Sequence, residues 1–200
     1  NNKWANISVT LNTLQSYTFQ SGPDNTITIA NGKWYTMNFE DAGYVNTRAI
    51  FMETSAEPVT IATVSVPAIV NAGEPATITI TTPLAPSAEE LFYLRYTTDG
   101  WATSVAIPVT MTGTSGTATF PGMAAGTTVS YYAFSSTVPA ITDNFDLYSI
   151  KLNANGGANY TYTVSTAPAI PTLTEWALIL LGVFLLGIGV FYIVQRRQVC

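Results

Sequence analysis

The chain has 200 residues, with 7 basic and 12 acidic side chains, no histidine and one cysteine. These counts exclude histidine-dependent catalysis, histidine-ligated metals, internal disulfides and CxxC zinc or redox sites. The net charge of −5 argues against nucleic-acid binding, which needs a basic surface. We therefore predict a non-enzymatic protein with no cofactor, no metal site and no nucleic-acid partner.

The composition predicts an extracellular bacterial β protein. Only 10% of the residues are charged, whereas 48% are apolar and 12% aromatic. Ordinary globular domains carry about 25% charged residues. Thr, Val, Ile and Tyr favour strands, and Gly and Pro interrupt them.

Residues 1–57 predict a small, hairpin-rich β domain. Strand-like runs occupy residues 6–11, 16–20, 26–30, 33–39 and 48–53. Asn31-Gly32 lies between two alternating runs and is the strongest hairpin signal in the chain. That hairpin would place Ile27, Ile29 and Trp34 on one face and Tyr35, Met37 and Phe39 on the other. Two apolar faces predict a strand that is covered on both sides, or one side left for a ligand or a partner subunit.

Residues 58–166 predict a second, larger β domain. Strand candidates follow one another at 59–66, 75–81, 91–97, 105–112, 117–120, 128–136 and 159–164. Turn signals such as Asp99-Gly100 and Gly156-Gly157 separate them, and residues 138–152 interrupt the pattern as an insertion. About seven short strands of this kind indicate an Ig-like or fibronectin-III-like β-sandwich. The segments LRYTTDGWATS (94–104) and TATFPGMAAGTTVSYYAFSS (117–136) resemble Ig-like modules of secreted bacterial proteins, which often stand beside polysaccharide-degrading domains.

Trp34 and Trp101 are candidate sugar-stacking residues, because an aromatic face packs well on the CH-rich face of a sugar ring. Trp101 follows the Asp99-Gly100 turn, where a side chain can stand at a loop tip. The alternative is core packing, since small sandwiches usually bury a tryptophan or tyrosine. Buried tryptophans favour a structural protein, and an exposed coplanar row favours a sugar binder.

Acidic residues predict no catalytic or metal site. Neighbours such as Glu89 and Glu90 are expected to point to opposite sides, so they would not converge on one glycosidic bond. Asp143, Asn144 and Asp146 are oxygen ligands at short spacing, but they lack the glycine and terminal glutamate of an EF-hand. A solvated loop is the preferred interpretation there.

A linker at 167–175 leads to an uncharged stretch at 176–194, WALILLGVFLLGIGVFYIV, and a basic tail at 195–200. As a helix this stretch would be about 28 Å long, close to the roughly 30 Å of a bilayer core. Arg196 and Arg197 after it are typical of a cytoplasmic membrane-stop signal. These features predict a transmembrane helix, with a buried core helix as the alternative.

Gly182 and Gly189 are seven residues apart and therefore share one face of that helix. Small residues on one face allow a neighbouring helix to approach closely. We interpret the two glycines as a helix-packing stripe; tolerated membrane glycines are the alternative.

The order of features at the C-terminus is itself a motif. Ile170, Pro171, Thr172 and Leu173 come first, then Glu175 and Trp176, the apolar stretch and two arginines. This arrangement resembles the IPTL-CTERM protein-sorting tail of exported bacterial proteins. The resemblance implies export to the cell surface and an exosortase-like membrane enzyme as a processing partner.

The expected fold is thus mainly β: an Ig-like β-sandwich preceded by a smaller β domain and followed by one C-terminal hydrophobic helix. The expected function is that of a bacterial cell-surface structural protein, held by its helix and assembling with copies of itself into a filament or layer with bundled helices at the core. The alternative is a membrane-anchored carbohydrate-binding or adhesion module, whose partner would be a polysaccharide.

Overall fold

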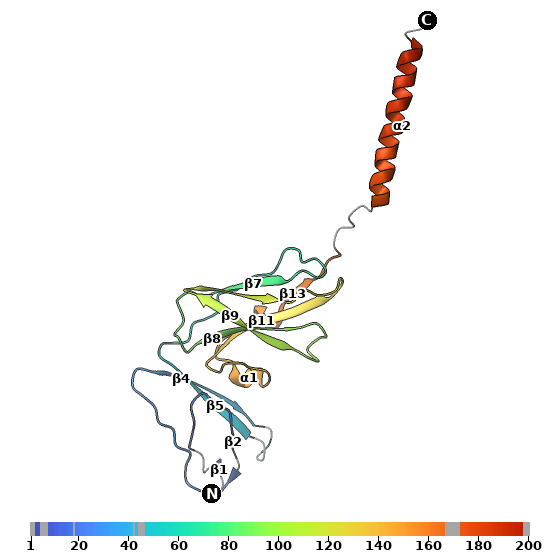
Figure 1. The fold of residues 1–200 in the computed structure, drawn as a ribbon. Coiled ribbons are helices and arrows are strands. Elements are labelled where there is room, and N and C mark those ends of the chain that lie inside the picture. The colour runs from blue at the N-terminus through green and yellow to red at the C-terminus, as the bar shows by residue number, and fades with distance from the viewer. Residues whose placement is uncertain are drawn as a thin grey trace. The chain divides into compact units, whose positions relative to one another are not determined.

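The computed structural model describes residues 3–4, 8–17, 19–41, 43, 47–166 and 173–197. The chain divides into two units, residues 1–166 and 167–200. It is mainly β, as predicted (Figure 1). All strands of the described residues belong to the first unit, and the long C-terminal helix belongs to the second.

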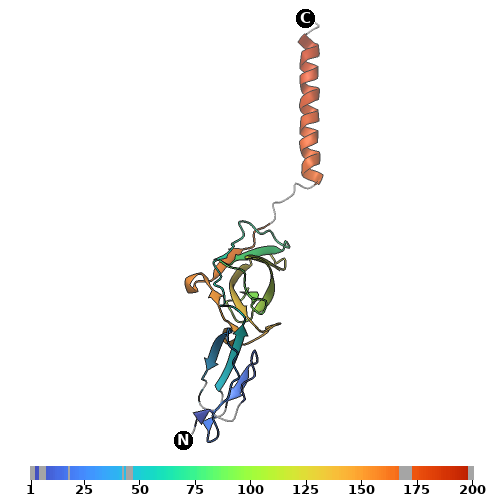
Figure 2. The same ribbon diagram turned by 90° about the vertical axis from the view of Figure 1, so that its left-hand side faces the viewer.

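The larger part of the first unit is an antiparallel sheet that folds over around one core (Figure 2). Its strands are β6 (Thr63–Val64), β7 (Ala76–Thr81), β8 (Leu91–Thr97), β9 (Val105–Thr112), β10 (Ser115–Phe120), β11 (Thr128–Ser136), β12 (Leu152–Asn153) and β13 (Tyr160–Thr163). The order is β12-β11-β8-β9-β10-β7-β6, and β13 also pairs with β11. We refer to this part as the sandwich.

Strand β9 connects the two halves of the sandwich. Its first part pairs with β8, up to Val109 opposite Phe92, and its last part pairs with β10, from Thr110 opposite Thr117. A strand that changes partner along its length carries the sheet around a corner. Pro108 lies just before this change and has no N–H to donate to a ladder.

Alternating side chains fill the space between the halves. Ile78 and Ile80 of β7 face Phe92 and Leu94 of β8, and all four are fully buried in one cluster. Tyr131 lies in the same cluster, donates its hydroxyl to the carbonyl oxygen of Ser65 at 2.6 Å, and has its pKa raised by burial. Each such apolar side chain contributes about 1.5–3 kcal/mol through burial.

The insertion at 138–152 covers the outer face of β8 and β11. It contains the short helix α1 (Phe145–Tyr148), followed by β12 and a 3-10 turn, η1 (Asn155–Gly157). Ile141 and Phe145 of the insertion form a second cluster with Tyr93 and Phe134. The sheet is therefore apolar on both faces at β8 and β11, and both faces are covered.

A separate three-stranded sheet precedes the sandwich, with the order β2-β5-β4 (Figure 1). Its strands are β2 (Gln15–Tyr17), β4 (Trp34–Glu40) and β5 (Thr47–Thr54), while β1 (Lys3–Trp4) pairs with β3 (Phe19–Gln20). We refer to β2, β5 and β4 as the N-terminal sheet.

The predicted hairpin around Asn31-Gly32 is wrong. The turn exists, with Gly32 in the left-handed region (φ +77°), but residues 27–30 form no strand. Strand β4 pairs with β5 instead, Trp34 opposite Thr54. The physical reason is burial: β5 brings Ile50 and Met52 into the interior, whereas Ile29 stays 65% exposed.

One face of the N-terminal sheet packs against the sandwich. The amide of Asn38 in β4 donates to the carbonyl oxygens of Leu147 (2.8 Å) and Ser149 (2.6 Å). Arg48 of β5 donates to the side-chain oxygen of Asn144 at 2.7 Å. The opposite face presents the exposed Met37 and Phe39, whereas the second apolar face predicted from Ile27 and Ile29 is absent because residues 27–30 form no strand.

The second unit contains α2 (Leu173–Arg197), which begins inside the predicted linker. A helix that crosses a bilayer needs roughly 20 apolar residues. Among the described residues, no helix reaches the length and apolarity required. The transmembrane segment predicted at 176–194 is therefore not found.

Candidate functional site

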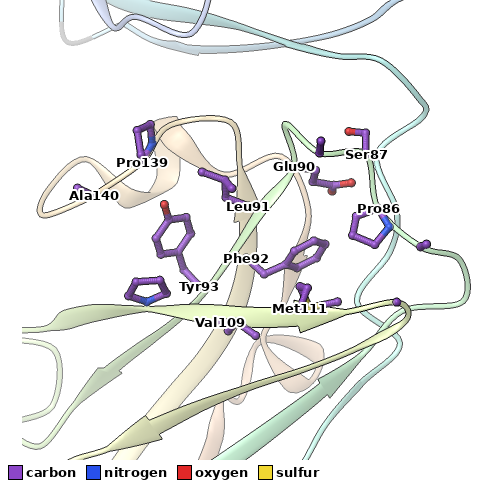
Figure 3. Close-up of a pocket in the computed structure, with 14 residues that line it drawn as sticks. Pro86, Ser87, Glu90, Leu91, Phe92, Tyr93, Val109, Met111, Pro139 and Ala140 are labelled. Carbon is purple, nitrogen blue, oxygen red and sulfur yellow. The ribbon is translucent and has the colours of Figure 1, made fainter.

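A groove of about 550 Å³ opens beside β8 and β9 (Figure 3). Its lining is mostly apolar and includes Pro86, Leu91, Phe92, Tyr93, Val109, Met111 and Pro139. Tyr93 fixes one wall, because its hydroxyl donates to the carbonyl oxygen of Val138 at 2.9 Å. A surface of this chemistry is suited to burying apolar groups.

Glu90 is the charged residue in the groove lining, and its carboxylate is already engaged. One oxygen accepts from the backbone N–H of Val59 (3.1 Å) and the other from the Ser135 hydroxyl (2.8 Å). Burial raises the pKa of Glu90, and these hydrogen bonds and Lys151 act in the opposite direction. Glu90 therefore ties the chain at Val59 to β11 and has a structural role in the groove.

Glu89 holds a different neighbour. Its carboxylate accepts from the Ser55 hydroxyl at 2.8 Å, and hydrogen bonds, that of Ser55 first, lower its pKa to about 2. Glu89 is exposed whereas Glu90 is buried, and both precede β8 rather than lying in a strand. That the two form no catalytic pair stays a prediction.

A cluster of aromatic rings surrounds Arg95 of β8. The guanidinium lies 4.0 Å from the ring centre of Phe145, 5.1 Å from that of Trp101 and 5.7 Å from that of Tyr132. It also donates to the Tyr132 hydroxyl (2.7 Å) and the Ser104 hydroxyl (2.9 Å). A cation held over several rings fixes their relative positions.

Trp101 belongs to this cluster. Its ring centre lies 5.4 Å from that of Tyr132, and the residue adopts a left-handed conformation with φ +73°. The preceding turn is held by Asp99, whose carboxylate accepts from the hydroxyls of Thr103 (2.6 Å) and Thr97 (2.7 Å). These hydrogen bonds, that of the Thr103 hydroxyl first, lower the pKa of Asp99 to about 2. The contacts favour the packing role for Trp101 over an open stacking platform.

Trp34 is placed differently, at the start of β4 in the N-terminal sheet, and is 48% exposed. The two candidate sugar-stacking tryptophans are thus apart, Trp34 on the N-terminal sheet and Trp101 in the turn between β8 and β9. Their role in sugar binding stays a prediction.

A small polar cleft of about 220 Å³ lies where the N-terminal sheet meets α1, lined in part by Glu40, Arg48 and Asn144. Arg48 forms an ion pair with Glu40 and occupies the side-chain oxygen of Asn144. The Arg48 contact therefore occupies Oδ1 of Asn144, one of the oxygens considered above as a calcium ligand. In the part of the chain that the structure describes, no three acidic, cysteine or histidine side chains gather around a common point.

Helix α2 exposes its side chains on every face. All described side chains from Trp176 to Phe191 are exposed, and the large apolar ones are 49–72% accessible. A Cβ added to Gly182 or Gly189 would meet nothing within 4 Å. Leu173, Glu175, Arg196 and Arg197 lie in the helix, whereas the motif residues Ile170, Pro171 and Thr172 fall outside the described residues.

Comparison with known proteins identifies the tail. The model of the IPTL-CTERM motif matches residues 168–198. This motif is associated with exosortase-like processing and indicates an exported bacterial protein anchored at the surface. No curated protein and no solved structure matches the chain.

Proposed function

We propose that this chain is a non-enzymatic structural protein of the bacterial surface, whose β domains are displayed outside and whose apolar helix bundles with the helices of other copies. The observation that carries the proposal is the exposure of Trp176–Phe191 around the whole circumference of α2. A contiguous apolar surface beyond a few hundred Å² marks an interaction site. At about 25 cal/mol per Å², covering this helix would stabilise an assembly strongly.

The occupant that fits best is another copy of the same helix. Gly182 and Gly189 lie two turns apart, within about 20° of each other around the helix axis. Gly187 lies about 140° away from Gly182, on a different face. Two helices that meet along the Gly182–Gly189 face approach closely, because no side chains separate their backbones there.

The test compares the full chain with Gly182→Ile/Gly189→Ile and with the matched control Gly187→Ile, by sedimentation and negative-stain imaging. Isoleucine adds apolar area, so a loss of assembly cannot come from lost apolar surface. It would show that the larger side chains keep the two helix backbones apart. We expect wild type and Gly187→Ile to assemble, and the double variant to lose at least tenfold of the assembled fraction. Solitary wild-type particles, or a double variant that assembles like wild type, would contradict the proposal.

For the sandwich we propose an Ig-like or fibronectin-III-like module. The support is its strand order: β6, β7 and β10 are neighbours in one half, β8, β11 and β13 are neighbours in the other, and β9 joins the two halves. Ig-like sandwiches likewise hold their first, second and fifth strands in one sheet and their third, sixth and seventh in the other.

A carbohydrate-binding or adhesion module is the second candidate, and the exposed ring of Trp34 favours it. Its test is retention of the full chain on insoluble polysaccharide. Adhesion predicts that Trp34→Ala abolishes retention while assembly persists. Retention that is absent from wild type, or unchanged in Trp34→Ala, would contradict this second candidate.

A further inference from the structure

The N-terminal sheet has an edge that the sandwich lacks. The outermost strands of the sandwich are short, with two residues in β6 and β12 and four in β13, whereas β4 at the edge of the N-terminal sheet has seven. Long apolar edges recruit further strands, and natural proteins usually keep edges short or charged. The exposed Trp34 and Met37 place apolar side chains at the start and in the middle of β4.

The backbone directions in β5 reveal which groups of β4 point outward. Asn12 donates its backbone N–H to the carbonyl oxygen of Phe51 (2.7 Å), and its side chain accepts from the N–H of Glu53 (3.1 Å). Phe51 and Glu53 therefore direct their backbone groups away from β4.

In an antiparallel ladder, both backbone groups of a residue point to the same side, and the side alternates along the strand. Met37 is opposite Phe51 and Tyr35 is opposite Glu53. The N–H and C=O groups of Tyr35 and Met37 thus point to the outer edge of β4. No strand within the described ranges pairs with that edge.

We propose that β4 pairs antiparallel with β4 of a second copy, across a two-fold axis that passes through Met37. A two-fold axis makes the contact self-complementary and closed. In this register Met37 is opposite Met37 of the second copy. Lys33 and Asp41, which directly precede and follow β4, are then opposite each other across the axis.

The charged residues at the two ends of β4 favour this register over the registers in which the axis is shifted by one residue. Moving the axis by one residue would place Lys33 opposite Phe39, or Asp41 opposite Tyr35. Opposite charges across strands stabilise a pair, and a mismatch of charge and apolar surface does not. Both hydrogen bonds that Asp41 accepts, from Gly43 and Thr47, use the same oxygen, Oδ1. The other carboxylate oxygen can therefore receive Lys33 of the partner, whose Nζ lies 3.8 Å from Glu53 Oε1 of its own chain and would bridge the two carboxylates.

This interface goes beyond the helix bundle, because it joins the β domains of two copies directly. An assembly with both contacts would be linked at two independent places along each chain. Loss of one contact leaves the other intact, which makes the two proposals separable by experiment.

The experiment is disulfide trapping in the full chain, with Cys200→Ser as background. Opposed residues of a hydrogen-bonded antiparallel pair have Cα atoms about 5.5 Å apart, within the range that a disulfide spans. We expect Met37→Cys to form the interchain disulfide at least tenfold faster than Val105→Cys, whose native side chain is 52% exposed against 53% for Met37. Trp34→Cys controls for register, since its two copies would be about 20 Å apart.

Equal rates for Met37→Cys and Val105→Cys would overturn the proposal, and faster trapping through Trp34→Cys would overturn the register. The same trapping in the Gly182→Ile/Gly189→Ile background separates this interface from the helix bundle. We expect the Met37→Cys disulfide to persist there at no less than half its rate. A disulfide that disappears in that background would show that β4 pairing depends on the helices.

Discussion

The sandwich and the N-terminal sheet both have strands with apolar side chains, but they differ in how far the faces of these strands are buried. In the sandwich, both faces of β8 and β11 are covered, one by the opposite half and one by the insertion. In the N-terminal sheet, Ile50 and Met52 are buried on one face, while Met37 and Phe39 remain exposed on the other. Covered faces and edge strands of two to four residues suit the sandwich to folding by itself, whereas the N-terminal sheet needs a neighbour.

That neighbour is in part the sandwich. Asn38 and Arg48 bond to the region of α1, and the hydroxyl of Thr137 donates to the side-chain oxygen of Asn12 at 2.6 Å. A three-stranded sheet alone buries too little apolar area to be stable. The N-terminal sheet is therefore stabilised in part by its polar contacts with the sandwich, whereas the sandwich is stabilised by its own core.

The largest effect should come from the sandwich core. Phe120 is fully buried, with ring centres 4.6 Å from Tyr96 and 5.4 Å from Tyr131. We expect Phe120→Ala to lower the free energy of unfolding by about 3–5 kcal/mol, because it leaves a cavity between the halves. Urea denaturation followed by tryptophan fluorescence measures this. Ile29→Ala, at a 65% exposed site, is the control and should change the free energy by less than about 0.5 kcal/mol.

The strands of the sandwich were the most predictable part of the fold. Strands β8, β9 and β11 begin and end where the sequence predicts, because turn residues mark their ends. The first sandwich strand is shorter than expected, reduced to Thr63–Val64. Val59, before it, gives its N–H to the side chain of Glu90, and a local pattern cannot reveal a bond between residues 31 positions apart.

The N-terminal sheet was less predictable for the same reason. Asn31-Gly32 marks a turn correctly. A turn signal alone does not show whether β4 pairs with the segment before the turn, residues 26–30, or with β5. The Arg95 cluster was missed because its rings come from the Trp101 turn, β11 and the insertion. The only local signal was an arginine in a strand of a chain with 10% charged residues. The sorting tail was readable directly, since it is a linear motif.

The next effect should come from the junction between the two regions. Asn38→Ala removes both hydrogen bonds to the carbonyl oxygens of Leu147 and Ser149, which should cost about 1–3 kcal/mol. Hydrogen exchange should then lose protection in β4 and β5 and keep it in β8 and β11. The control is Asn71→Ala, whose amide bonds to Glu74 inside the sandwich (3.1 Å) and should leave β4 and β5 unchanged. Protection lost equally from both regions would show that they unfold as one cooperative unit.

The smallest effect should be a pH dependence of stability. It differs between Asp99, in the turn after β8 of the sandwich, and Glu89, at the junction with the N-terminal sheet. The pKa of Asp99 is lowered to about 2 from an ordinary 3.8, chiefly by the Thr103 hydroxyl. Folded Asp99 therefore binds its proton less tightly than unfolded Asp99. Its contribution to stability is present above about pH 4 and is lost as the pH falls towards about 2.

Asp99→Asn should consequently lower the melting temperature by about 2 °C or less above pH 4, with the difference from wild type vanishing near pH 2. Glu89→Gln provides the comparison, because the pKa of Glu89 is also about 2 but its carboxylate bonds to Ser55, the residue that follows β5. Hydrogen exchange as a function of pH should show the Glu89→Gln effect in β5 and the Asp99→Asn effect in β8. If both variants changed the same strands, the polar contacts would join the two regions more tightly than their buried faces suggest.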